Sequence, residues 1–105
     1  MQVHEYFLRQ KECRDMYGKQ YLLFENIGSD YLMYQYGNND FIRYISSLLQ
    51  IVLLTKYTYS GPVKVVLFNT RHKEDCINKL NENGYSPVFY ENGKVIRPEI
   101  KEKLP

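Results

Sequence analysis

Three segments of the chain carry apolar residues at helical spacing, and a pair of short apolar runs follows each of them. The helices are predicted at 2–16, 41–50 and 71–83. The short runs are rich in β-branched, aliphatic and aromatic residues, which is typical of strands. They fall at 21–24, 31–36, 51–59, 63–68, 88–90 and 95–96. This order predicts an α/β (α+β) fold, with a mixed central sheet of about six strands and three helices packed on it.

Turn residues mark the ends of these elements. Gly18 is well placed to cap the first helix at its C-terminus. Gly28-Ser29-Asp30 predicts a hairpin turn between the first two strands, and a turn cluster occupies 37–40. Asn69 or Thr70 can cap the third helix. Asn92-Gly93 is the strongest local signal, because this dipeptide favours the tight turn of a β-hairpin.

Length and composition indicate one soluble domain. The 105 residues are 44% hydrophobic and 25% charged, so residues 1–97 are expected to form a single core, followed by a short charged tail at 98–105. No run approaches the roughly 20 apolar residues of a membrane helix, and the start of the chain does not resemble a secretion signal. We therefore expect a cytoplasmic protein without a membrane partner. Cys13 and Cys76 are expected to be buried free thiols, since they lack the spacing of a zinc site.

The sequence offers little for catalysis. His4 and His72 are the two imidazoles, and neither has the context of a catalytic triad. The Gly-rich loops that hold nucleotide phosphates are absent. We therefore expect no enzyme, no cofactor, no metal and no nucleotide partner. A small nuclease is a weaker alternative, because Glu99 and Lys101 have the spacing of a metal-dependent nuclease motif.

Basic residues alternate with tyrosines in one part of the chain. Lys56, Tyr57 and Tyr59 lie across a predicted hairpin from Lys64, and Arg71 and Lys73 follow at the start of the third helix. Such lysines can contact phosphates while the tyrosines pack against sugars or bases, and a helix N-terminus adds backbone donors for an anion. These six residues are the candidate DNA-binding set. The plainer alternative is an ordinary charged hairpin and a solvated helical turn.

Four segments of the chain resemble sequence motifs of the N-terminal mismatch-recognition domain, domain I, of the MutS DNA mismatch repair proteins. A helix precedes a Leu-Leu-Phe strand there, as it does here before 21–24. That family's Met-Gly-Asp-Phe-Tyr-Glu-Leu-Phe lies where this chain has 27–34, with Gly28 and Tyr31 matching outright. Residues 48–56 and 79–91 are similar to two further motifs of the family, which follow in the same order along the chain. The resemblance spans nearly the whole chain and implies a domain I-like fold.

The resemblance also implies what is missing. In that family the Phe of the motif wedges beside a mispaired base and the Glu bonds to it, and these roles fall here on Asp30 and Leu32. Neither residue can perform them, because a carboxylate is repelled by phosphates and leucine makes no hydrogen bond. We expect these two residues at an exposed rim. We also expect a free-standing, non-enzymatic module that binds the backbone or shape of double-stranded DNA weakly without reading mismatches. The alternative is a protein-interaction module that docks on a larger DNA-processing protein through a Tyr-rich sheet edge.

Overall fold

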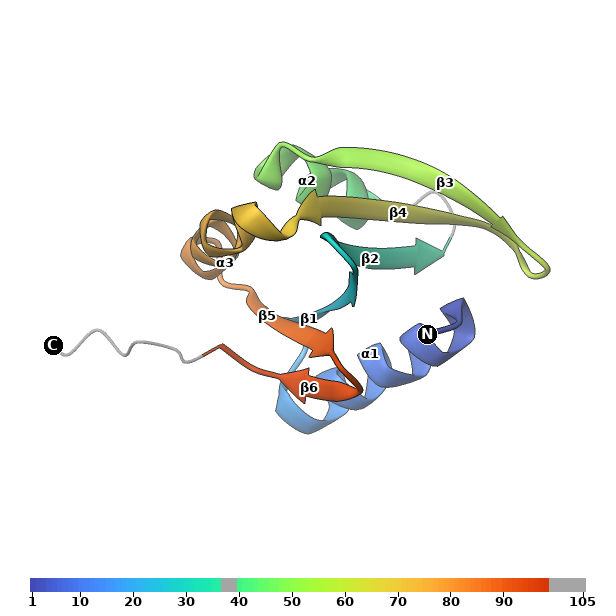
Figure 1. Ribbon diagram of the computed structural model, residues 1–105, viewed down its shortest axis with the longest axis horizontal. Helices are drawn as coiled ribbons and strands as arrows, with labels where there is room; N and C mark the ends of the chain where they lie inside the picture. The colour runs from blue at the N-terminus through green and yellow to red at the C-terminus, as the bar shows by residue number, and fades with distance from the viewer. Residues whose placement is uncertain (37–39, 99–105) are drawn as a thin grey trace, which may run out of the picture.

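The computed structural model describes residues 1–36 and 40–98, and its helices and strands follow the predicted order (Figure 1). Most of the turn predicted at 37–40 and the tail from Glu99 onward, with Lys101, lie outside the described residues. The elements are α1 (Val3–Tyr17), β1 (Tyr21–Ile27), β2 (Asp30–Tyr36), α2 (Asp40–Leu49), β3 (Val52–Thr58), β4 (Gly61–Asn69), the 3-10 turn η1 (Thr70–His72), α3 (Lys73–Glu82), β5 (Ser86–Glu91) and β6 (Lys94–Ile96).

The strands form one mixed sheet of six in the order β3-β4-β2-β1-β5-β6. Only β1 and β5 are parallel neighbours, and the other four pairs are antiparallel. With three α-helices packed on it, the sheet confirms the predicted α+β fold class. Within the described residues, no helix is long and apolar enough to cross a membrane.

The helices lie on the two faces of the sheet. On one face, Tyr6 of α1 is fully buried and its ring contacts Tyr34 of β2, with the ring centroids 4.9 Å apart. On the other face, Lys73 at the start of α3 lies over the ring of Phe89, and α2 packs against α3. Residues of both layers fill the core between helices and sheet, including Cys76 and Leu80 of α3.

Several local predictions are confirmed. Gly18 ends α1 in a left-handed conformation, with φ at 132°, and its amide donates to the carbonyl of Arg14. The side chain of Asn69 accepts a hydrogen bond from the amide of Arg71, but it caps the 3-10 turn η1; α3 itself begins later, at Lys73, and its N-cap residue, His72, makes no side-chain capping bond. Cys13 and Cys76 are buried free thiols, and burial raises the pKa of Cys76 to about 11.

The first two strands separate soon after their turn. β1 pairs with β2 only from Glu25 to Ile27, so the first half of β1 has no strand on that side in the part of the chain that the structure describes. The side chain of Gln10 takes the place of the missing strand. Its Oε1 accepts from the amide of Leu23 at 2.7 Å, and its Nε2 donates to the carbonyl of Tyr21 at 3.0 Å. The hydroxyl of Tyr6 donates to the Leu23 carbonyl at 2.6 Å. Side chains of helix α1 thus provide hydrogen-bond partners for the backbone groups at the open edge of β1. Leaving such groups unpaired inside a protein would destabilise the fold.

Candidate functional site

The hairpin formed by β3, β4 and their connecting turn, residues 52–69, is here called the arm; β4 pairs with β2 along residues 63–69, and the tip of the hairpin extends beyond β2 (Figure 1). Three of the candidate DNA-binding residues are exposed near its tip. The side chains of Tyr57 and Tyr59 are 81% and 112% exposed, and Lys56 is exposed beside them. Lys64 is half-buried on β4 and its Nζ donates to Thr55 Oγ1 at 2.7 Å. The arm therefore carries four of the six candidates.

The two lysines of the arm lie on opposite faces of the ribbon. Residues that are paired across neighbouring strands share a face. Lys64 pairs with Thr55 and Tyr57 with Pro62, which places Lys64 and Tyr57 on one face. Lys56 pairs with Val63 and lies on the other face, where its Nζ is 5.8 Å from the ring centroid of Tyr34.

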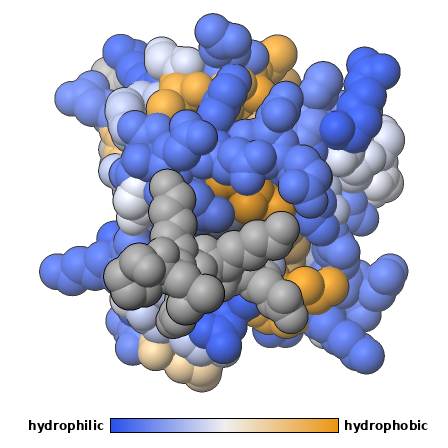
Figure 2. Space-filling view, turned by 90° about the vertical axis from the view of Figure 1, so that its left-hand side faces the viewer, coloured by the Kyte–Doolittle hydropathy of each residue, from blue (hydrophilic) through white to orange (hydrophobic). Residues whose placement is uncertain are grey.

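The remaining two candidates lie at the far end of β4. This strand has nine residues, so roughly 30 Å separates the tip of the arm from η1, at about 3.3 Å per residue. Arg71 is exposed there. The end of the molecule opposite the tip, which includes η1 and α3, presents mostly hydrophilic side chains (Figure 2). The structure therefore places the six candidates in two separate groups and does not bring them together.

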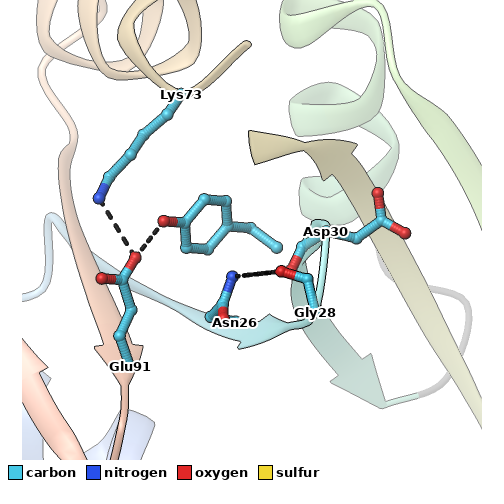
Figure 3. A network of polar contacts seen from close by, with 6 residues as sticks. Asn26, Gly28, Asp30, Lys73 and Glu91 are labelled. Atoms are coloured by element: carbon cyan, nitrogen blue, oxygen red, sulfur yellow. Dashed lines mark hydrogen bonds and ion pairs between the residues drawn. The ribbon is translucent and has the colours of Figure 1, made fainter. Parts of the chain in front are cut away.

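Lys73 has partners within the fold. Its Nζ lies 3.2 Å from Oε1 of Glu91, and the two side chains point toward each other (Figure 3). The hydroxyl of the buried Tyr31 donates to the same carboxylate oxygen. The ammonium also lies 4.5 Å from the ring centroid of Phe89. This network ties β2, α3 and β5 together, so Lys73 is less available to an outside ligand than Arg71.

The network changes the acidity of its members. The hydrogen bond from Tyr31 and the nearby ammonium of Lys73 hold the pKa of Glu91 below its ordinary value. Burial and the bond to Glu91 raise the pKa of Tyr31. Burial lowers the pKa of Lys73, but the bonds to Tyr31 and Glu91 outweigh it, so the pKa is raised overall. All three shifts favour the charged carboxylate, the neutral phenol and the charged amine, which is the arrangement of a structural clamp.

We predict that Glu91→Gln lowers the free energy of unfolding by about 1–2 kcal/mol at neutral pH, because it removes a charge-assisted bond to Lys73. Since folding lowers the pKa of Glu91, its contribution is complete above the ordinary value of 4.5 and is lost as the pH falls below it. The difference between the two proteins should therefore shrink below pH 4.5, as measured by urea unfolding at several pH values. The exposed Glu82→Gln is the control; a difference that does not change with pH would contradict this role of Glu91.

The positions that match the mismatch motif lie at the turn between β1 and β2. Gly28 is exposed there with φ at 60°, and the side-chain amide of Asn26 donates to its carbonyl. Asp30 is the first residue of β2, and its carboxylate points away from Lys73 and Glu91 (Figure 3). Leu32 is half-buried against the core. Asp30 and Leu32 thus share the face opposite Tyr31. Both are half-buried, so the structure does not place these two residues at an exposed rim.

The distribution of charge adds a signal that residue-by-residue reasoning missed. Residues 41–73 contain five basic residues, namely Arg43, Lys56, Lys64, Arg71 and Lys73, and no Asp or Glu. The other nine of the 14 basic residues, and all 12 acidic residues, lie outside this stretch. The net charge of +2 therefore conceals a region that is free of acidic side chains and runs from Phe41, the second residue of α2, through the arm and η1 to Lys73. Such segregation favours an anionic partner.

No protein-family model matches the chain, and no curated protein sequence matches it.

Proposed function

We propose that the protein is a non-enzymatic module that binds the backbone of double-stranded DNA weakly through the arm. The observation that carries this proposal is the combination, on one projecting hairpin, of exposed Tyr57 and Tyr59 with Lys56 and Lys64 and with no acidic residue. Two-stranded ribbons fit the grooves of DNA, lysines contact phosphates, and tyrosines pack against sugars or bases. Arg71, at the other end of β4, belongs to the same acid-free region.

The resemblance to MutS domain I supports the same partner, and we propose that the module derives from that fold. Its mismatch-reading positions are Asp30 and Leu32, so we propose that the module does not distinguish a mismatch from a paired duplex. We also propose that the module acts in the cytoplasm.

The experiment is a titration of labelled homoduplex, mismatched and single-stranded DNA at several salt concentrations. We expect affinity for duplex DNA to fall steeply with salt, because cations are released from neutralised phosphates. Homoduplex and mismatched DNA should bind equally. In the double variant Lys56→Gln/Lys64→Gln, the slope of log affinity against log salt should fall by about two, at roughly 0.9 per lost phosphate contact.

The matched control is Lys79→Gln/Lys94→Gln, which removes the same charge from α3 and β6. It should keep the slope of the unmodified protein. An equal loss in both double variants would mean that net charge, and not the arm, governs binding.

A second function is favoured by the free edge of the sheet. Among the described residues, strand β3 has no neighbour on its outer side, and Val52 and Leu54 are 55% and 48% exposed on it. An unpaired edge of seven residues is a template for an added strand from another protein. We propose docking on a larger DNA-processing protein as the alternative. Affinity that is flat with salt, or absent for every DNA tested, would favour it over DNA binding.

A further inference from the structure

A cavity of about 970 Å³ opens between α1 and the diverging strands β1 and β2. It exists because β1 and β2 pair only over 25–27 and diverge on the N-terminal side of Glu25, while the side chain of Gln10 bonds to the edge of β1 from the helix. The described side chains leave this space unfilled. Its volume falls at the upper end of the roughly 300–1,000 Å³ that is typical of small-molecule sites.

The mouth of the cavity carries an excess of positive charge. Lys11, Arg14, Asp15 and Lys19 line it. The Nζ of Lys11 lies 3.0 Å from Oδ2 of Asp15, so these two charges offset each other. Neither Arg14 nor Lys19 forms an ion pair with any of residues 1–36 and 40–98. Two positive charges therefore remain at the mouth, which favours an anion over a metal ion or an uncharged lipid.

The interior offers aromatic and amide groups. Phe41 and Tyr85 both line the cavity, and their ring centroids lie 5.6 Å apart. Gln35 lines it as well, is half-buried, and has no side-chain hydrogen bond to the described part of the chain. A planar heterocycle suits this lining, because aromatic rings stack on its face and an amide both donates and accepts at its edge.

We infer that this cavity binds a phosphorylated nucleoside, either free or at the end of a nucleic-acid strand. Arg14 and Lys19 hold the phosphate, and the base lies against Phe41 and Tyr85 beside Gln35. The expectation of no nucleotide partner was based on the absence of Gly-rich loops, which hold phosphates through backbone amides. Here side-chain cations at the mouth take that role, without the machinery for hydrolysis. The site is additional to the proposed contact of the arm with duplex DNA.

The test is a calorimetric titration of the full chain with deoxyadenosine monophosphate, deoxyadenosine, inorganic phosphate and a 5′-phosphorylated dinucleotide. We expect the monophosphate to bind better than deoxyadenosine or phosphate alone. Binding of the dinucleotide as well would assign the site to a strand end, and binding of the monophosphate alone would assign it to free nucleotides. Equal binding of deoxyadenosine and its monophosphate, or no heat with any phosphorylated probe at millimolar concentration, would overturn the inference.

Variants locate the binding. Arg14→Gln/Lys19→Gln should weaken monophosphate binding about tenfold or more, since charge-assisted hydrogen bonds are lost. Both side chains are exposed, so the fold should survive, and thermal unfolding checks this. Lys79→Gln/Lys94→Gln is the control for net charge, and Lys56→Gln separates this site from the arm. If either of these variants weakened binding as much as the double variant, the assignment to the cavity would be wrong.

Discussion

Replacing Gln10 with leucine is expected to lower the free energy of unfolding by about 2–4 kcal/mol, because two backbone groups of β1 lose their hydrogen-bond partners at once. The amide of Leu23 and the carbonyl of Tyr21 both depend on this one side chain. Leucine has a similar size, so the loss reports the hydrogen bonds more than the packing. Urea unfolding followed by circular dichroism measures the change.

Two further variants sharpen this test. Gln20→Leu changes the same residue type at an exposed position near the start of β1, and we expect it to stay within about 0.5 kcal/mol of the unmodified protein. Gln10→Glu keeps the acceptor for the Leu23 amide but loses the donor to the Tyr21 carbonyl. Its loss of stability should therefore lie between those of Gln20→Leu and Gln10→Leu. A Gln10→Leu protein as stable as Gln20→Leu would show that the side chain does not replace a strand.

Phe89→Ala is expected to cost about 3–5 kcal/mol, the usual range for removing a fully buried aromatic ring. Phe89 is 0% exposed on β5 and its ring contacts those of Phe24 and Tyr31, at centroid distances of 5.9 and 4.8 Å. The ammonium of Lys73 also lies over it. The substitution therefore weakens both the core and the Tyr31–Glu91–Lys73 network.

Tyr57→Ala is the matched control for Phe89→Ala. The side chain of Tyr57 is 81% exposed on the arm, so the free energy of unfolding of this variant should differ from that of the unmodified protein by no more than about 0.5 kcal/mol. If the proposed function is correct, this variant instead loses affinity for DNA. Comparable unfolding curves for the two variants would mean that the ring of Phe89 contributes little to the core.

The order of the elements was predictable because each one is marked locally. Apolar spacing and turn residues identify helices and strands without reference to the rest of the chain. The ends differ by a few residues: β1 was predicted to stop at Phe24 and continues to Ile27, and β5 was predicted from Val88 and begins at Ser86. The additional residues are held by pairing with a neighbouring strand: Ile27 lies opposite Asp30 across the hairpin turn, and Ser86 lies opposite Tyr21, which is distant in the sequence.

The sheet order and the polar contacts were not predictable, since they depend on residues far apart in the chain. Nothing near Gln10 indicates that its amide replaces a strand. Glutamate is usually found at the surface, yet Glu25 is only 2% exposed, and its Oε2 lies 3.3 Å from the amino group of Met1. The bond between Tyr31 and Glu91 joins residues that are 60 positions apart.

For the candidate site, local sequence identified the residues but not their placement. Lys56 and Lys64 are close across a hairpin, as expected, but the alternation of side chains along each strand puts them on different faces. Arg71 and Lys73 follow β4 in sequence, and the length of that strand carries them far from the tip. The absence of acidic residues over 41–73 could have been noticed from sequence, because it requires only a count.

The opposed lysines of the arm restrict how it can meet a duplex. A ribbon that lies flat on one phosphate backbone engages a single face and leaves one ammonium in solvent. A ribbon inserted edge-on between two backbones presents Lys56 to one wall and Lys64 to the other. The major groove is about 12 Å wide, enough for the two-stranded tip of the arm. From Val63 onward β2 pairs with β4, and Gln35 lies opposite Lys64, so the sheet is three strands wide there. For a duplex partner, insertion of the tip thus brings the two cations to the rim of the groove, where the phosphates lie.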